Sequence, residues 1–399
     1  MRFAGPADQV LSGYFRAHGE LGQRDRAFIA EACFAVLRRR RSLEAAVAST
    51  EPRELLAAVL VRVLGFSGRA LGELVRPELI ERVRSARPDA WPDGVRADLP
   101  DWLWQRLAAE RGGDEAMRLA QSLLNAAPLD LRVNLARTSR EDVLARLARD
   151  GIVARATPYS PAGVRLAAKP AINHHMLFRD GLIEVQDEGS QLLAFLLAPR
   201  RGEMVADYCA GAGGKTLALA MLMRGSGRVY AMDVSAKRLA ALGARAARAQ
   251  VSNIHSIALA GDNDARAKRL AGKLERVLVD APCSGFGTLR RNPDLKWRHD
   301  AAAIGELAQK QRRILEAAAR LVKPGGRLVY ATCSILHEEN EAIADAFQAR
   351  HPEFRVLSCS ELLATQRIAL DTGERLRLAP HLHGTDGFFA TAFERFVTS

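Results

Sequence analysis

Residues 276–291 read Arg-Val-Leu-Val-Asp-Ala-Pro-Cys-Ser-Gly-Phe-Gly-Thr-Leu-Arg-Arg, and this stretch decides the fold. The apolar run Val277–Val279 stops at Asp280, Pro282 and two glycines, which is typical of a buried parallel strand that ends in a loop. Pro282 fixes its own φ and lacks an N–H donor. The loop is therefore expected to be stiff where Cys283 projects from it.

A second strand of the same kind is predicted at residues 327–332, which read Arg-Leu-Val-Tyr-Ala-Thr. Cys333 and Ser334 follow it directly. Ligands of open α/β sheets bind at the carboxyl ends of the strands. The sequence therefore predicts that Cys283 and Cys333 face one crevice.

The length and composition predict a chain of two or three domains with a large core. It has 399 residues, of which 48% are hydrophobic, and this exceeds what one core usually serves. Lys and Arg outnumber Asp and Glu by 58 to 46, which gives a formal charge of +12. This charge leaves two interpretations open, a polyanionic partner or a merely basic enzyme.

The cysteine pattern favours a reducing cytoplasm. The five cysteines stand at positions 33, 209, 283, 333 and 359 and form no Cys-x-x-Cys, so neither a disulfide framework nor a metal site is indicated. The first residues contain no apolar signal segment, and no run reaches ~18 apolar residues. Secretion and membrane spanning are both disfavoured.

Residues 1–125 have the pattern of helices rich in Ala, Leu and Arg. Phe28, Ala32 and Val36 share one helical face, which is predicted to be core. The run Arg38–Arg41 has two interpretations, contact with phosphates or an ordinary solvated face.

The pattern changes near residue 126, where apolar and polar residues alternate along 129–135 as in a half-buried strand. Thr138-Ser-Arg-Glu141 resembles a capping box that opens a helix. A small α+β module is predicted for residues 126–188. Residues 189–399 then alternate apolar strands with helical runs, which is typical of a doubly wound, mostly parallel sheet.

A glycine-rich loop follows the first of these strands and reads Asp-Tyr-Cys-Ala-Gly-Ala-Gly-Gly-Lys-Thr over residues 207–216. A Walker A loop needs glycine where Cys209 stands, and a dinucleotide fingerprint needs it where Thr216 stands, so both are disfavoured. Asp233 ends the next strand, where an acid typically accepts hydrogen bonds from ribose hydroxyls. With Asp262 and Asp280, this predicts a cleft for a positively charged nucleoside without phosphates, S-adenosylmethionine.

The motifs together resemble one family. The strings are Asp207–Thr216, Val-Asp-Ala-Pro-Cys-Ser-Gly at 279–285, Leu-Arg-Arg-Asn-Pro-Asp-Leu-Lys-Trp-Arg at 289–298, Tyr-Ala-Thr-Cys-Ser at 330–334 and His-Gly-Thr-Asp-Gly-Phe-Phe at 383–389. In this order they closely resemble the Sun/Fmu (RsmB-like) family of RNA cytosine-5 methyltransferases. The resemblance covers residues 125–399, and residues 1–125 resemble more weakly a shortened NusB-like helical domain.

The resemblance implies three domains. They are a NusB-like RNA-binding domain at 1–125, a ferredoxin-like or RRM-like module at 126–188, and a Rossmann-like class I methyltransferase domain at 189–399. The last is expected to have a seven-stranded, mostly parallel sheet.

The resemblance also implies the site. Cys333 matches the family's nucleophile and Cys283 its second cysteine. The implied S-adenosylmethionine site consists of Cys209, Ala210, Gly211, Ala212, Gly213, Gly214, Lys215, Asp233, Asp262 and Asp280. The family usually has Ala-Pro where this chain has Gly211 and Ala212, and the loss of proline is expected to free the loop backbone.

The implied activity is methylation of carbon-5 of a cytosine in RNA through a covalent cysteine adduct. Small-subunit (16S) ribosomal RNA is the expected substrate; the alternatives are transfer RNA, or an RNA-binding assembly factor with secondary catalysis. The basic residues Arg290, Arg291, Lys296 and Arg298 follow the Cys283 loop, which suggests contacts to RNA or ordinary surface solvation; the arginines are interpreted as RNA contacts and Trp297 as core.

Overall fold

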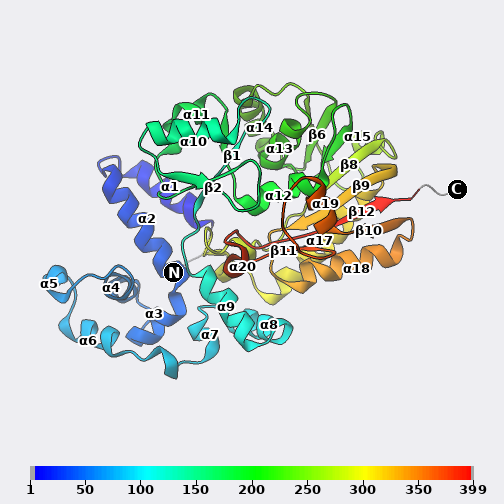
Figure 1. Cartoon of the computed structure of the whole chain (residues 1–399). Helices are drawn as coiled ribbons and strands as arrows, with labels where there is room; N and C mark the ends of the chain where they lie inside the picture. Colours follow the sequence, from blue (N-terminus) through cyan, green and yellow to red (C-terminus); the bar gives the residue numbers. More distant parts are fainter. Residues whose placement is uncertain (1–4, 397–399) are drawn as a thin grey trace. The chain divides into compact units, whose positions relative to one another are not determined.

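The computed structural model describes residues 5–396, apart from the side chain of Glu73, and Figure 1 shows its elements in chain order. Contacts divide the chain into two compact units. The first joins the described residues up to Ala126 to the segment Gly285–Ala303. The second holds the rest, so the chain leaves the second unit once and returns to it. The boundary expected after residue 125 lies beside this division, while both sides of residue 188 lie in the second unit.

The regular elements described in the first unit are helices. They are α1 (Ala7–Ala17), α2 (Gln23–Arg38), α3 (Arg40–Val47), α4 (Pro52–Arg62), α5 (Gly68–Leu71), α6 (Pro77–Ser85), α7 (Asp93–Arg96), α8 (Asp101–Arg111), α9 (Gly113–Leu123) and α16 (Leu295–Arg298). Pro52 and Pro77 each occupy the first position of a helix, where their fixed φ suits the helix and no N–H is needed.

The core of the first unit lies between α2, α3, α4 and α6, where Val36, Leu43 and Leu55 are buried. Ala32 and Val36 are buried as predicted. The prediction is wrong for Phe28, whose side chain is 44% exposed and meets the Phe66 ring edge-on.

The arginine run at the end of α2 is turned into the first unit. Arg38 donates to the carbonyl of Arg290, and Arg39 to that of Leu124. Arg41 donates to the carbonyl of Leu99 at 2.6 Å. Three of its four guanidinium groups therefore hold backbone carbonyls of this unit, and Arg40 pairs with the Glu44 side chain at 2.7 Å.

Two side chains of α16 bind carbonyl groups at the C-terminal end of α2. The Lys296 amine donates to the carbonyls of Arg38 at 2.7 Å and Asp98 at 2.6 Å. The Trp297 indole donates to the carbonyl of Leu37 at 2.7 Å. The last carbonyls of a helix have no partner inside it, so α16 supplies the missing donors.

Burial corrects the RNA contacts expected near α16. Lys296 is 2% exposed and Arg290 is 7% exposed, so neither presents its charge on a surface. Burial lowers the pKa of Lys296 to about 7. A neutral amine carries two N–H groups, one for each of the two carbonyls it meets.

The second unit begins with a four-stranded antiparallel sheet in the order β2-β3-β1-β4. Its elements are β1 (Leu129–Val133), α10 (Arg140–Arg149), β2 (Ala154–Ala156), β3 (Gly163–Leu166), α11 (Met176–Arg179) and β4 (Ile183–Val185). The predicted N-cap is displaced by one residue, because Ser139 rather than Thr138 caps α10 by accepting from the backbone N–H of Asp142, while the Thr138 hydroxyl donates to the Asp142 carboxylate at 2.7 Å.

The large sheet of the second unit follows the order β10-β12-β9-β8-β5-β6-β7, and β11 pairs with β12. Its strands are β5 (Met204–Asp207), β6 (Arg228–Asp233), β7 (Ile254–Ala258), β8 (Leu274–Asp280), β9 (Val322–Thr332), β10 (Phe354–Leu357), β11 (Leu376–Leu378) and β12 (Phe388–Arg395). Neighbouring strands from β7 to β9 are parallel, whereas β12 runs antiparallel to β9.

The mostly parallel sheet is as predicted, but it has eight strands rather than seven. The extra strand arises because β10 and β11 share one edge of β12. Leu357 of β10 pairs with Ala392, and Leu376 of β11 pairs with Ala390, so the two short strands occupy successive halves of β12.

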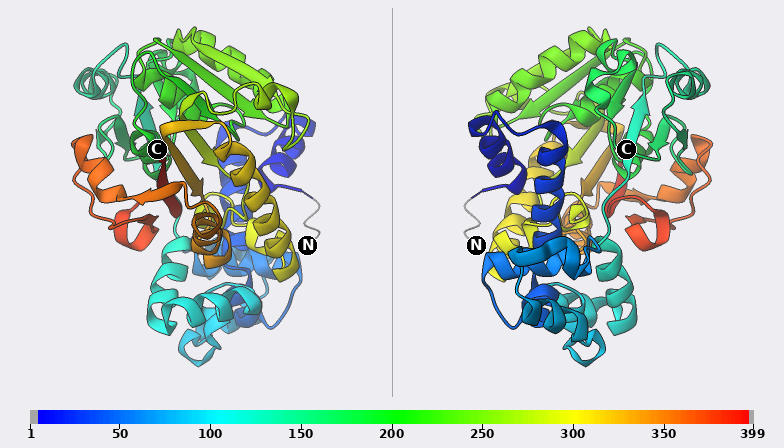
Figure 2. Two further views of the ribbon diagram at one scale, coloured as in Figure 1. Left: turned by 90° about the vertical axis from the view of Figure 1, so that its right-hand side faces the viewer. Right: turned by 90° about the vertical axis from the view of Figure 1, so that its left-hand side faces the viewer.

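Helices cover both faces of the large sheet (Figures 1 and 2). They are α12 (Glu188–Leu197), α13 (Gly214–Leu222), α14 (Ala236–Ala249), α15 (Ala265–Lys268), α17 (Ala301–Ala319), α18 (Glu341–Arg350), α19 (Cys359–Thr365) and α20 (Pro380–His383). Successive residues of β9 point to opposite faces, so Val329 packs in the core with α12 and α13, and Tyr330 in the core with α17 and α18.

No helix in the described part of the chain is both long enough and apolar enough to span a membrane.

We expect Lys296→Met to lower the free energy of unfolding by about 1–3 kcal/mol at pH 9, because two buried carbonyls lose their donor. The loss should be smaller at pH 6. The pKa of Lys296 is about 7 in the folded state and near 10.5 in the unfolded state. Below pH 7 folding therefore buries a charged amine, which lowers the free energy of unfolding of the wild type. This penalty disappears as the pH rises from 7 to 10.5. Methionine does not titrate.

Denaturant unfolding at the two pH values measures this difference, with Arg298→Met as the matched control. Arg298 contacts Asp294 at 3.3 Å and supports no buried carbonyl pair. If the loss of unfolding free energy in Lys296→Met does not grow between pH 6 and pH 9, Lys296 is not the neutral donor to the two buried carbonyls.

Candidate functional site

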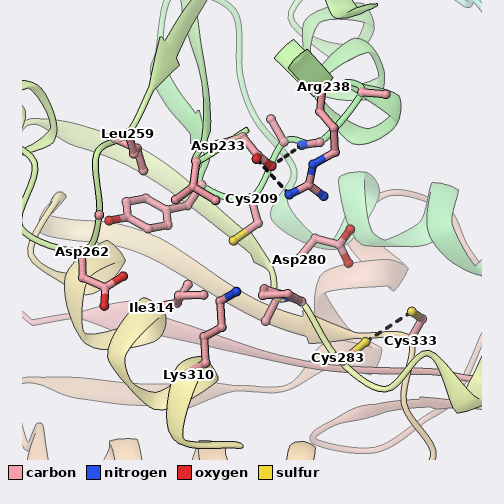
Figure 3. Close-up of a pocket in the computed structure, with 18 residues that line it drawn as sticks. Cys209, Asp233, Arg238, Leu259, Asp262, Asp280, Cys283, Lys310, Ile314 and Cys333 are labelled. Carbon is pink, nitrogen blue, oxygen red and sulfur yellow. Dashed lines mark hydrogen bonds and ion pairs between the residues drawn. The ribbon is translucent and has the colours of Figure 1, made fainter. Parts of the chain in front are cut away.

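The carboxyl ends of the parallel strands surround a cavity of about 380 Å³ in the second unit (Figure 3). The predicted site residues that line it are Cys209, Ala210, Gly211, Ala212, Asp233, Asp262, Asp280, Cys283 and Cys333. The structure thus brings together residues from the carboxyl ends of five strands, β5 to β9.

Three residues of the predicted site, Gly213, Gly214 and Lys215, are not among those that line the cavity. Gly213 has φ of 84°, and a Cβ there would lie 2.1 Å from Leu242 Cδ1, so only glycine fits. Gly214 begins α13, and its carbonyl accepts a hydrogen bond from Arg132 at 2.6 Å. These residues shape the loop behind the cavity wall.

Asp233 anchors the glycine-rich loop. Its Oδ2 accepts from the backbone N–H of Gly211 at 2.9 Å, and its Oδ1 accepts from that of Ser235 at 2.7 Å. The Arg238 guanidinium contacts the same Oδ1 at 3.0 Å (Figure 3). Gly211 has φ of 55°, so a glycine stands where the backbone of this loop is left-handed.

Asp280, at the end of β8, is held by Lys215. The Lys215 amine meets Asp280 Oδ2 at 2.5 Å. Burial disfavours the lysine charge, but the charge and hydrogen bond of Asp280 outweigh it and raise the pKa of Lys215. Lys215 therefore stays charged and fixes Asp280 at the cavity wall.

The two predicted cysteines lie side by side at one end of the cavity (Figure 3). Cys283 Sγ and Cys333 Sγ are 3.3 Å apart and can share a hydrogen bond. That hydrogen bond, with burial, raises the pKa of Cys283 well above its ordinary value. Cys283 therefore keeps its proton in this state and can donate it toward Cys333.

Two buried side chains at the carboxyl end of β5, Asp207 and Cys209, have pKa values that burial shifts. Burial raises the pKa of Cys209 well above its ordinary value, so this thiol stays protonated. Asp207 is 1% exposed and its Oδ2 accepts from the Thr216 hydroxyl at 2.7 Å, whereas its Oδ1 has no hydrogen-bond partner within residues 5–396. Burial raises the pKa of Asp207 to about 7.

Other groups of the cavity were not predicted. Lys310 and Ile314 reach it from α17, and Arg238 from α14 (Figure 3). Asp262, predicted from its strand end, lies nearer the surface and contacts Arg313 at 3.5 Å. The helical residues carry no sequence signal of their own, because their orientation depends on how each helix packs on the sheet.

A buried carboxylate that contacts the residue after each cysteine was also missed. Glu339 ends the 3-10 turn η5 (His337–Glu339) and is fully buried. Its oxygens accept from the backbone N–H of Ser284 at 2.8 Å and from the hydroxyls of Ser284 and Ser334, both at 2.5 Å. The sequence offers only an acidic stretch after a strand, which is more often solvated.

Among residues 5–396, no group of three or more His, Cys, Asp or Glu side chains is placed to hold a metal ion.

Two family models match the sequence. The model described as 16S rRNA methyltransferase RsmB/F matches residues 194–394, and that of the RsmF/B-like ferredoxin-like domain matches residues 99–173. The second match begins before the module predicted at 126–188 and ends within it.

Curated relatives and solved structures agree with these matches. The probable ribosomal RNA small subunit methyltransferase B of Synechocystis sp. is 37% identical over 298 residues, which are 74% of this chain and 66% of the relative. The corresponding protein of Bacillus subtilis is 34% identical over 77% of this chain and 70% of its own length. The crystal structure of PH0851 superposes with a TM-score of 0.78 at 28% identity and covers 96% of this chain and 93% of that one.

We expect the free energy of unfolding of Asp207→Asn to rise relative to the wild type as the pH increases from 4 to 7. The pKa of Asp207 is raised from 3.8 to about 7 on folding, so its contribution to stability is present below pH 4 and is lost as the pH rises through 7. Thermal or denaturant unfolding across this range measures the difference. Asp264→Asn is the control, because its pKa is lowered through hydrogen bonds with Arg266, and its contribution should stay constant between pH 4 and 8. A flat difference for Asp207→Asn would contradict the prediction.

Proposed function

This chain belongs to the 16S rRNA methyltransferase RsmB/F family, and we propose that it transfers a methyl group from S-adenosylmethionine to carbon-5 of a cytosine in RNA. Small-subunit ribosomal RNA is the proposed substrate, as the names of its relatives suggest. The observation that carries the proposal is the pair of sulfur atoms 3.3 Å apart in a cavity that is also lined by three carboxylates.

The residues of the cavity suit S-adenosylmethionine. Asp233, Asp262 and Asp280 line a space of about 380 Å³, and their negative charges complement a sulfonium cation. Asp233 is the proposed ribose ligand, because its carboxylate has acceptor capacity beyond the two backbone N–H groups and Arg238 that it meets. When bound, the cofactor would supply an electrophilic methyl group.

The chemistry at carbon-5 explains why a nucleophile is needed. This carbon is not nucleophilic in the aromatic cytosine ring, so a thiolate must first add to carbon-6 and make carbon-5 enamine-like. Carbon-5 then takes the methyl group and still carries its hydrogen. Loss of that proton restores the double bond and releases the thiolate from carbon-6.

The two thiols are proposed to have different roles in the reaction. We assign Cys333 as the nucleophile and Cys283 as the group that governs the proton on carbon-5. A thiol at Cys283 that donates to Cys333 stabilises the Cys333 thiolate before attack. Once Cys333 is bonded to carbon-6 its sulfur is a weak acceptor, so it no longer holds the proton of Cys283 through a strong hydrogen bond. Cys283 can then give its own proton to water and accept the one from carbon-5, directly or through a second water molecule.

Asp280 is proposed to accept from the exocyclic amine of cytosine. Lys215 uses its Oδ2, so Oδ1 is the proposed acceptor for the base. A carboxylate there would repel the corresponding carbonyl of uracil. A target base must leave its stack to reach the cysteines, so an unpaired or easily opened site in RNA is expected.

We expect Asp233→Ala to weaken S-adenosylmethionine binding by about 1–3 kcal/mol, because hydrogen bonds to a charged acceptor are lost. Titration calorimetry measures the change. Lys237→Ala, which removes an exposed charge from α14, the helix that follows Asp233 in the chain, is the matched control and should bind as the wild type does. Unchanged affinity of Asp233→Ala would reject the ribose role.

The two cysteine variants should fail at different steps. Cys333→Ala should bind cofactor and RNA but form no adduct and transfer no methyl group. Cys283→Ala should add to the base and transfer the methyl group, then stall at elimination. It should accumulate a covalent protein-RNA species that carries the labelled methyl group.

Denaturing electrophoresis with labelled S-adenosylmethionine distinguishes these outcomes, with the double variant as the negative control. Cys33→Ala, in the first unit, controls for loss of a thiol and should behave as the wild type. If Cys333→Ala traps the adduct instead, the two roles are exchanged. If neither variant traps one, the covalent mechanism is rejected.

A further inference from the structure

The Glu339 carboxylate joins the two loops that carry the cysteines. One oxygen, Oε2, accepts from the hydroxyls of Ser284 and Ser334, both at 2.5 Å. The other, Oε1, accepts from the Ser284 backbone N–H at 2.8 Å and from Gln311 Nε2 at 2.9 Å. Four donors from three parts of the chain therefore meet on one side chain that is fully buried.

The position of the two serines relates this contact to the thiols. Ser284 follows Cys283 directly, and Ser334 follows Cys333 directly. The serine hydroxyls also lie 3.2 Å from each other. The loops are thus linked one residue beyond each sulfur, where the strand pairing that ends at Asp280 no longer fixes them.

The surrounding groups keep the carboxylate in place. The Tyr330 hydroxyl donates to the backbone carbonyl of Glu339 at 2.6 Å, which fixes η5. The next residue, Asn340, donates to the carbonyl of Ser334 at 3.1 Å. Gln311, which binds the carboxylate, also donates to the carbonyl of Pro282 at 3.0 Å, immediately before Cys283.

The burial of this charge limits how it can be replaced. An ionised carboxylate removed from water is strongly unfavourable unless charge-assisted hydrogen bonds compensate it. Here the compensating donors are the residues whose positions set the cysteine loops. A change at Glu339 is therefore expected to disturb both loops together.

We propose that Glu339 is a positioning residue that holds Cys283 and Cys333 within contact of each other by tying Ser284 to Ser334. The inference rests on the proposed function for its catalytic meaning, since the two thiols are the groups assigned to that reaction. Its geometric content, the proximity of the thiols, can be measured without any methyl transfer.

The test uses phenylarsine oxide, which forms two As–S bonds with a pair of adjacent thiols and releases water. The full chain should bind it tightly through Cys283 and Cys333, and Cys283→Ala should lower the affinity by at least about 100-fold, because the second attachment is lost. Glu339→Ala should approach the affinity of Cys283→Ala. Glu339→Gln, which keeps the shape and one acceptor, should fall between Glu339→Ala and the wild type.

Kinetics provide the second measurement. In Glu339→Ala we expect kcat for methyl transfer to fall at least about 100-fold, as a 1 Å misplacement of reacting groups can cause, while the Kd of S-adenosylmethionine and the KM of RNA change little. Partial recovery of kcat in Glu339→Gln is expected. Glu341→Gln is the matched control, because Glu341 pairs with Arg377 at 2.7 Å rather than with either serine. This variant should keep the wild-type affinity for phenylarsine oxide and the wild-type kcat for methyl transfer.

The outcomes separate the two proposals. Wild-type affinity for phenylarsine oxide in a folded Glu339→Ala would overturn the positioning role. Reduced affinity in this variant, together with a wild type that methylates no RNA, would leave the positioning role intact and reject the proposed function. If Glu339→Ala does not fold, Glu339→Gln with unchanged arsenical affinity and unchanged kcat would overturn the inference.

Discussion

The parallel pairing of β8 with β9 is the interaction on which the rest of the site depends. Its register sets Asp280 opposite Ala331, so the strands end together and Cys283 and Cys333 follow within three residues of the last pair. Adjacent parallel strands must be joined by a long crossover, and here that crossover includes α17. The same helix supplies Lys310 to the cavity and Gln311 to the network below it.

Much of the fold was predictable because local patterns and global position agree. The apolar run before Asp280 and the one before Cys333 are strands, and both cysteines line one cavity as predicted. The glycine-rich loop was recognisable because Gly213 must adopt a left-handed backbone conformation against Leu242. Such features can be predicted because they are determined by a few residues that are adjacent in the sequence.

Other features depended on packing that local patterns do not contain. Arg38 and Lys296 looked like surface cations, yet both turn inward to bind carbonyls that only the assembled helices bring near. Glu338 and Glu339 are adjacent glutamates in the short turn η5, and the path of this turn buries the Glu339 side chain. The strand β11 is three residues long and exists because β12 leaves half of an edge open.

The helical unit is discontinuous in sequence, and this has a consequence for its folding during synthesis. The donors for the C-terminal end of α2 come from α16, about 170 residues after Ala126. At translation rates of about 5–20 residues per second, the first helices wait on the order of 10–30 s for Lys296 and Trp297. During that interval most of the second unit is synthesised, including the strands from β1 to β8. The helical unit, although first in the chain, is completed only after the loop that carries Cys283 has been synthesised.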